Sequence, residues 1–155
     1  MEYSIVKVNK DNYIMYDNMI FCSRHGRDKN EDELKKERNF TADYAALENE
    51  NFYIFAAQTQ NIFVGYITIV YIPKVGIDYH GYNGHLYIDD LWINPSYRKK
   101  GLAKALMDKA DMICQEKKIS GLRVGVHGTN GEAIALYNKC GYEYINTNLI
   151  MEKQW

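Results

Sequence analysis

Residues 85–103, HLYIDDLWINPSYRKKGLA, combine a strand, a turn, a run of three cations with a glycine, and the start of a helix. The N–H groups at a helix start lack partners within the helix, and the helix dipole adds partial positive charge there, so the position suits a phosphate. Gly101 lets the backbone approach such a group without a Cβ, and Ala103 keeps the approach narrow. With the cations at 98–100, these features predict a cradle for a diphosphate.

Taken alone, the segment has a second interpretation. An ordinary capped helix with a solvated cluster of charges shows the same residues, and this alternative stays open. The segment lacks the GxxxxGK[ST] pattern of a P-loop. It also lacks the three glycines that a dinucleotide-binding fingerprint places after the first strand of a βαβ unit.

Hydrophobic periodicity and turn residues predict the elements on either side of this segment. Strands and helices alternate only in the second half of the chain. This order predicts an α/β (α+β) fold with a mixed sheet, antiparallel early and parallel where a helix crosses over. The expected strands are 4–8, 52–59, 62–72, 85–93, 121–127 and two short ones within 142–155, and the expected helices are 11 or 12 to 24, 31–47, 101–118 and 131–139.

Composition narrows the class of protein. A chain of 155 residues fits one domain, 1–155. The net charge of −1 argues against a nucleic-acid partner, and no apolar stretch approaches the length of a membrane span. No leader peptide is expected at the N-terminus. Cys22, Cys114 and Cys140 form no CxxC pair, so neither a metal site nor a disulfide framework is expected, and a cytoplasmic location is the default.

Two motifs carry a family resemblance. Residues 98–103, RKKGLA, match the [RQ]xxGx[GA] signature of the GNAT acetyltransferases, and the preceding LWINPSY at 91–97 resembles the strand and turn that lead into it. A second motif downstream resembles the family's NxxAxxLYxKxGF pattern, with tyrosine in the last position, and consists of Asn130, Ala133, Leu136, Tyr137, Lys139, Gly141 and Tyr142. The two motifs occur in the family's order across 87–142, and together they are far more specific than either alone.

The resemblance implies the GNAT fold, with a mixed central sheet of about six to seven strands flanked by helices. Two neighbouring parallel strands, here 86–93 and 122–127, would splay apart in a V that holds acetyl-CoA, and no metal is implied. By this resemblance, the residues that would bind the cofactor are Leu91, Trp92, Ile93, Arg98, Lys99, Lys100, Gly101, Leu102, Ala103, Lys104, Asn130, Ala133, Tyr137 and Lys139.

Tyr137 is the first candidate catalytic residue. Asn130, Ala133 and Tyr137 are spaced by three and four, so they share one face of a helix and leave a groove over the small residue. Acyl transfer from a thioester creates a thiolate, to which a phenol can donate a proton. The alternative is a core aromatic with a satisfied hydroxyl. With the upstream motif present, we predict the general-acid role.

Asp89 and Asp90 interrupt an otherwise apolar strand, and in a regular strand their side chains point to opposite faces. An edge position or a salt bridge is the structural alternative. An amine resembling that of lysine has a pKa of about 10.4, so it must lose a proton before it attacks. Asp89, nine residues before Arg98, resembles the family's acidic residue and is our first candidate base. Asp90 is the second and His127 the third, with a loop-anchoring role for this histidine as the alternative.

The acceptor pocket is expected between the first two helices and the 73–84 loop. Acidic and aromatic side chains together suit a cation, although residues 31–33 equally fit a solvated acidic helix face. The side chains concerned are Glu31, Asp32, Glu33, Asp43, Tyr44, Asp78, Tyr79, His80 and Tyr82.

These features together predict an acetyl-CoA-dependent N-acetyltransferase in which a primary amine attacks directly within a ternary complex. A small cationic amine, such as a polyamine or an aminoglycoside, is the expected substrate. The alternatives are an acetyltransferase of protein or peptide amines, a non-catalytic acyl-CoA-binding module of this fold, and a phosphate-binding module of another fold. Neither nucleic acid nor membrane is expected as a partner; a homodimer is allowed, with Trp155 as a candidate contact.

Overall fold

The computed structural model describes residues 2–38, 44–74, 83–146 and 151–154. The chain divides into two compact units, residues 1–125 and 126–155, and each is described by itself. The first unit contains β1 (Ser4–Lys7), α1 (Tyr13–His25), α2 (Glu31–Arg38), α3 (Ala45–Glu48), β2 (Phe52–Thr59), β3 (Ile62–Pro73), β4 (Gly84–Ile93), a 3-10 turn (Pro95–Tyr97), α4 (Leu102–Lys117) and β5 (Leu122–Val124); the second contains α5 (Gly131–Lys139).

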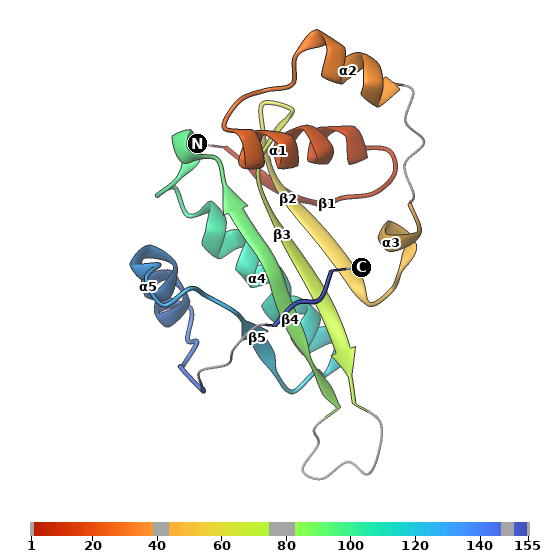
Figure 1. Cartoon of the computed structure of the whole chain (residues 1–155). Helices are drawn as coiled ribbons and strands as arrows, with labels where there is room; N and C mark the ends of the chain where they lie inside the picture. Colours follow the sequence, from red (N-terminus) through yellow and green to blue (C-terminus); the bar gives the residue numbers. More distant parts are fainter. Residues whose placement is uncertain (1, 39–43, 75–82, 147–150, 155) are drawn as a thin grey trace. The chain divides into compact units, whose positions relative to one another are not determined.

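A single sheet organises the first unit (Figure 1). Its strand order is β1-β2-β3-β4-β5, with the first three pairs antiparallel and the β4–β5 pair parallel. The parallel pair occurs where α4 crosses over between its two strands, as the order of elements predicted. The expected mixed α/β fold is therefore confirmed.

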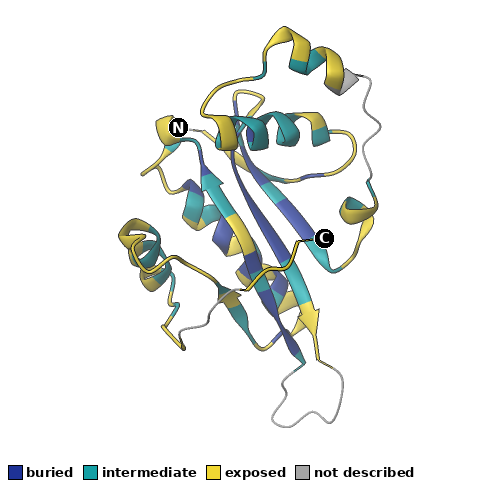
Figure 2. Ribbon diagram, viewed as in Figure 1, coloured by how far each residue is buried: buried dark blue, intermediate teal, exposed yellow. Residues whose placement is uncertain are grey.

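The two faces of the sheet are covered by different helices (Figure 1). On one face, Met19 of α1 packs with Ile54 and Tyr66 of the sheet, and Leu47 of α3 borders the same cluster. On the other face, α4 packs against β2, β3 and β4, and five of its apolar side chains are buried, so parts of this helix are dark blue in Figure 2. We call these the α1 face and the α4 face. Since side chains alternate along a strand, each residue of β3 belongs to one of them.

One expected helix and one expected internal strand differ from the structure. In place of the predicted helix 31–47, the structure has two helices, α2 and α3, and residues 39–43 between them lie outside the described part. The α2 helix is mostly charged, whereas α3 packs Leu47 against the core. The predicted strand 121–127 is only Leu122–Val124, because pairing with β4 stops there.

The sheet has five strands among the described residues, fewer than the six to seven expected. The shortfall lies in 142–155, where residues 142–146 and 151–154 form no strand and 147–150 lie outside the description. Tyr144, Ile145 and Met151 are exposed, so the described parts of this segment do not bury the apolar side chains that suggested strands.

The two helices predicted at the motifs, 101–118 and 131–139, are confirmed as α4 and α5. The α4 helix begins after Gly101 and ends at Lys117, and five of its apolar side chains are buried. The α5 helix spans the expected residues, and Gly141 beyond it has a positive φ of 84°, as expected at a helix C-terminus. No helix in the described residues is long and apolar enough to span a membrane.

Candidate active site

A β-bulge in β4 separates the two aspartates. Thr68 of β3 pairs with Asp90, while the next residue, Ile69, pairs with Ile88, so Asp89 is the extra residue of β4. In a regular strand Asp90 would share a face with Ile88, which is 2% exposed in the core under α4. The bulge instead turns Asp90 to the α1 face, and both carboxylates are exposed.

Asp90 is held by a tyrosine of the neighbouring strand. The Tyr66 hydroxyl donates a hydrogen bond of 2.5 Å to Oδ2 of Asp90. Burial, and then this bond to a carboxylate, raise the pKa of Tyr66. Burial and the negative charge of Asp90 also raise the pKa of Tyr16, on α1, to about 12. Both phenols therefore stay protonated at physiological pH and can act only as neutral hydrogen-bonding groups beside the carboxylate.

A row of aromatic rings extends from Tyr66, the hydrogen-bond partner of Asp90, along the α1 face. Tyr66 lies edge-on to Tyr16, with ring centroids 5.5 Å apart, and 6.2 Å from Trp92. The row continues from Tyr16 to Tyr13 at 6.2 Å and from Tyr13 to Tyr44 at 5.6 Å. One exposed negative charge beside a row of aromatic rings is a combination that favours an organic cation.

The strands β4 and β5 part beside the bulge. Their parallel pairing covers Leu86–Leu122, Tyr87–Arg123 and Ile88–Val124, and then ends. From residue 90 to residue 93, β4 pairs only with β3 among the described residues. The backbone of residues 91–93, which the resemblance assigned to the cofactor, therefore has one edge free of sheet pairing in the described structure, as the expected V requires.

The start of α4 has the backbone geometry of an anion cradle. Gly101 has φ of 83° and occupies the N-cap position, and no side chain caps the helix. An added Cβ at Gly101 would meet nothing within 4 Å, so the backbone is approachable there. Leu102 is 1% exposed, so its side chain belongs to the core and does not contact a ligand. Lys99 also has a positive φ, of 58°, and is exposed.

The other cations of this segment have partners in the protein. Arg98 Nε donates to the Ile93 carbonyl at 3.1 Å. Lys100 Nζ donates to the Ser96 carbonyl and lies 5.1 Å from the Tyr97 ring centroid. Lys104 pairs with Asp108 at 2.8 Å on the exposed side of α4. The contacts of Arg98 and Lys100 hold these two charges at the turn that precedes the helix, whereas the Lys104 pair lies within α4.

The second motif lies on and around α5, within the second unit. Asn130 is the N-cap, and its Oδ1 accepts a hydrogen bond from the Ala133 N–H at 3.1 Å. Tyr137 is half-buried, and its ring lies 5.7 Å from that of Tyr142. His127 is exposed, and its Nδ1 lies 2.8 Å from Thr129 Oγ1, which fits the loop-anchoring alternative. Lys139, in the last turn, is exposed.

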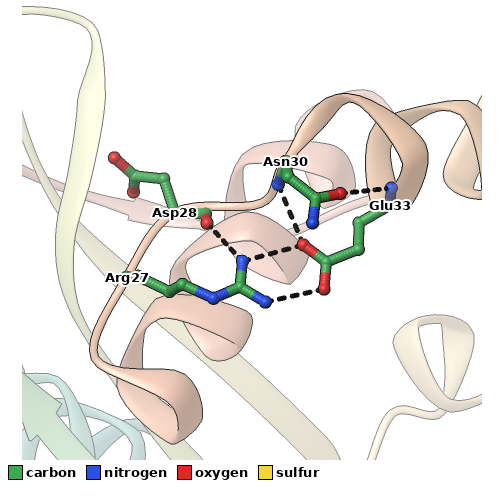
Figure 3. A network of polar contacts seen from close by, with 4 residues as sticks. All are labelled: Arg27, Asp28, Asn30 and Glu33. Atoms are coloured by element: carbon green, nitrogen blue, oxygen red, sulfur yellow. Dashed lines mark hydrogen bonds and ion pairs between the residues drawn. The ribbon is translucent and has the colours of Figure 1, made fainter.

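Glu33, in the acidic first turn of α2, takes part in capping the helix (Figure 3). Asn30 Oδ1 accepts from the Glu33 N–H at 2.9 Å, and Glu33 Oε2 accepts from the Asn30 N–H at 2.8 Å, so the two residues form a capping box. Arg27 donates two further bonds to the same carboxylate. The hydrogen bonds from Arg27 and from Asn30 lower the pKa of Glu33 to about 2. Glu33 is therefore committed to this cap, whereas Glu31 and Asp32 are exposed.

Other expected acceptor residues fall outside the described part of the chain: Asp43, Asp78, Tyr79, His80 and Tyr82. Conversely, Tyr16 and Tyr66 were not among the sequence candidates. The three-residue spacing of Tyr13 and Tyr16 on a helix was the available signal for α1. Nothing local to Tyr66 distinguished it from other strand tyrosines. Within the described ranges, no group of three or more His, Cys, Asp or Glu could hold a metal ion.

The match to a known protein family includes residues of both units. The family model "Acetyltransferase (GNAT) family" matches residues 15–142, which include the bulge, the start of α4 and α5. A thialysine N-epsilon-acetyltransferase of Caenorhabditis elegans is 31% identical over 97 residues. That match covers 59% of this chain and 58% of the relative, so the alignment spans little more than half of each protein.

Solved structures share the fold at low sequence identity. The aminoglycoside N-acetyltransferase AAC(6')-Iy, in complex with a bisubstrate analogue that contains CoA, is 14% identical with a TM-score of 0.74, and the match covers 100% of both chains. A ribosomal-protein-alanine N-acetyltransferase from Brucella melitensis biovar Abortus 2308 is 16% identical with a TM-score of 0.71, covering 99% of this chain and 100% of the other. At these identities the likeness concerns the fold.

Proposed function

Because this chain belongs to the GNAT family, we propose that it is an N-acetyltransferase that transfers an acetyl group from acetyl-CoA to the primary amine of a small cationic molecule. The observation that carries this proposal is the Asp90 carboxylate, exposed on the α1 face and bonded to Tyr66 beside Tyr16 and Trp92. A protonated amine is attracted by the charge and by the ring faces. The reaction proceeds by direct attack in a ternary complex.

The residues at the end of β4 and the start of α4 fit a CoA donor. The free edge of residues 91–93 offers backbone groups to an extended amide-containing arm, in the manner of an added strand. The approachable backbone at Gly101 and the cations at 98–100 suit a pyrophosphate. When bound, acetyl-CoA supplies the activated thioester. On the family resemblance alone, Asn130, Ala133 and Lys139 are proposed as further donor-binding residues.

The two aspartates are proposed to have different roles, one in binding the amine and one in accepting its proton. We assign Asp90 to hold the substrate ammonium, because its position is fixed by Tyr66. Asp89, exposed at the bulge, is assigned to accept the amine's proton, directly or through water. Tyr137 is assigned to donate a proton to the departing sulfur. His127 is the reserve candidate for the base.

The names of related proteins support a small amine without choosing among them. The relative from Caenorhabditis elegans is named for acetylating thialysine, a small amine. Structures of the same fold include aminoglycoside acetyltransferases as well as a ribosomal-protein-alanine acetyltransferase. A peptide or protein amine is therefore the second candidate, and a non-catalytic acyl-CoA-binding module is the third.

A thiol-release assay with acetyl-CoA and a panel of amines tests the proposal. The panel contains a polyamine, thialysine, an aminoglycoside, a peptide with a free N-terminus and a peptide with an internal lysine. We expect release with at least one small cationic amine and none with the peptides. Release with a peptide alone would replace the substrate assignment, and binding of acetyl-CoA without release on any amine would favour the non-catalytic module.

Matched variants test the two aspartates in the same assay. We expect Asp90→Asn to raise KM for the amine about tenfold or more, since a charged hydrogen-bonding partner is lost. Asp89→Asn should lower kcat most strongly at neutral pH, where the amine is protonated. Asp11→Asn, at an exposed position just before α1, is the control. If Asp90→Asn lowered kcat and Asp89→Asn raised KM, the two roles would be exchanged.

A further inference from the structure

Tyr87 lies where β4 and β5 part. It pairs with Val70 of β3 and with Arg123 of β5, one residue before the last β4–β5 pair, Ile88–Val124. Val70 follows Thr68 by two residues on β3, and Thr68 pairs with Asp90, so Tyr87 and Asp90 present their side chains on the same α1 face. Tyr87 is thus the residue of β4 on this face that immediately precedes the bulge.

The phenol of Tyr87 extends from β4 to the chain that leaves β5. A Cβ added at Gly125 would lie 2.8 Å from the Tyr87 hydroxyl oxygen. Gly125 directly follows Val124, the last paired residue of β5. The side chain of Tyr87 therefore crosses the point of parting, and the missing side chain at Gly125 makes room for its hydroxyl. Tyr87 is half-buried, and no hydrogen bond of its hydroxyl is seen among the described residues.

We propose that Tyr87, accommodated by Gly125, limits the length of the acyl group that the enzyme transfers, so that acetyl is accepted and longer acyl chains are excluded. This inference rests on the proposed function. A donor anchored at residues 98–103 and extended along residues 93 to 91 directs its acyl end toward Ile88 and Val124, where the strands meet. The ring of Tyr87 stands at that meeting point on the face where Asp90 would hold the amine.

The physical basis is steric. Each methylene that a pocket cannot accommodate costs a substrate roughly tenfold to a few hundredfold in kcat/KM. Shortening the side chain at position 87 should remove that cost in steps. The Tyr87→Phe variant would lack only the hydroxyl oxygen, whereas smaller side chains would open the space over Gly125.

The experiment compares acetyl-, propionyl-, butyryl- and hexanoyl-CoA in the thiol-release assay, with the amine that the wild type uses best. The variants are Tyr87→Phe, Tyr87→Leu and Tyr87→Ala. We expect the wild type to prefer acetyl over butyryl about tenfold or more, Tyr87→Phe to gain chiefly propionyl transfer, and Tyr87→Ala to reduce the acetyl preference about tenfold. Tyr71→Ala is the matched control, because Tyr71 pairs with Leu86 on the α4 face; it should keep the wild-type preference.

A binding measurement complements the kinetics. Thermal shifts of each variant with the same acyl-CoAs, without amine, should show butyryl- and hexanoyl-CoA stabilising Tyr87→Ala more than the wild type relative to acetyl-CoA. Tyr87→Leu carries the test if Tyr87→Ala does not fold. An unchanged acyl preference and unchanged relative shifts in a folded variant would overturn the inference while leaving the acetyltransferase in place. Absence of thiol release by the wild type with every acyl-CoA and amine would overturn the proposed function and this inference together.

Discussion

The hydroxyl of Tyr66 donates a hydrogen bond to Oδ2 of Asp90 across the β3–β4 pair, with 2.5 Å between the two oxygens. Tyr66 is 3% exposed, whereas Asp90 is exposed, so the bond joins the core of the α1 face to a carboxylate at its surface. A carboxylate fixed in this way presents its charge in one direction. That property suits a residue that binds a substrate ammonium.

Tyr66→Phe tests this relationship. Removing the hydroxyl frees Asp90 to adopt other rotamers while the aromatic ring stays in the core. We expect KM for the amine to rise about fivefold to tenfold, as for the loss of a hydrogen bond to a charged group, with a smaller change in kcat. Steady-state kinetics against amine concentration measure the split. Tyr71→Phe, which loses a hydroxyl bonded to the Asn83 carbonyl, is the control, and an equal effect there would count against a specific role of Tyr66.

Stability at alkaline pH should depend on Tyr16. Burial and the charge of Asp90 raise its pKa from 10.0 to about 12, so the unfolded chain loses this proton at a lower pH than the folded chain. The stabilisation is fully present below pH 10 and is lost as the pH rises toward 12. We expect Tyr16→Phe to flatten the fall of the unfolding free energy in this window by up to about 1.4 kcal/mol per pH unit. Denaturant unfolding at several pH values measures it. Equal slopes for wild type and variant would contradict the prediction, and Tyr144→Phe, at an exposed ring, is the control.

The capping box of α2 can be tested apart from catalysis. Asn30→Ala removes the side-chain oxygen that accepts from the Glu33 N–H, and a lost N-cap costs about 1 kcal/mol. We expect faster amide exchange in Glu31–Arg38 and a correspondingly lower unfolding free energy, while Asn30→Ser keeps most of the cap. Hydrogen exchange is the direct readout. Unchanged exchange in Asn30→Ala would show that Arg27 and Glu33 hold the helix without it.

Gly101→Ala should destabilise the protein because of the backbone conformation at this position, without any steric clash of the added methyl group. The added methyl would meet nothing within 4 Å, but a φ of 83° costs a residue with a Cβ about 1–2 kcal/mol. We expect this loss in denaturant unfolding, together with weaker acetyl-CoA binding. Gly131→Ala is the matched control, since its Cβ also enters open space but its φ is not positive. That change should be neutral or slightly stabilising at the start of a helix. Equal effects at the two glycines would refute the conformational argument.

Tyr137→Phe tests the general-acid assignment. If the phenol donates a proton to the departing sulfur, kcat should fall by about a hundredfold, within the usual range for acid catalysis. Acetyl-CoA affinity, measured by titration, should change little because the ring is retained. A kcat equal to that of the wild type would remove the assignment.

The sequence determined the elements whose signals are local. RKKGLA at 98–103 contains the cations and Gly101, which alone of these residues readily adopts the positive φ found at the start of α4. The periodic apolar residues that follow predict the helix itself. The sequence around the second motif likewise predicts the extent of α5, 131–139. These features depend on residues within a few positions of each other, so they are visible in the chain alone. The terminal strands were not, because strand formation requires a partner.

Tertiary structure alone decided which way Asp90 points. Two adjacent aspartates in a strand predict opposite faces, but they do not tell which one faces which helix, since the answer depends on register with β3. One extra residue, Asp89, turns Asp90 from the face of Ile88 to that of Tyr66. The same register aligns Tyr87 with Asp90 and brings it to Gly125, which is 38 positions away in the chain. The sequence thus determined the chemical groups of the site, whereas pairing between distant strands determined which of them meet.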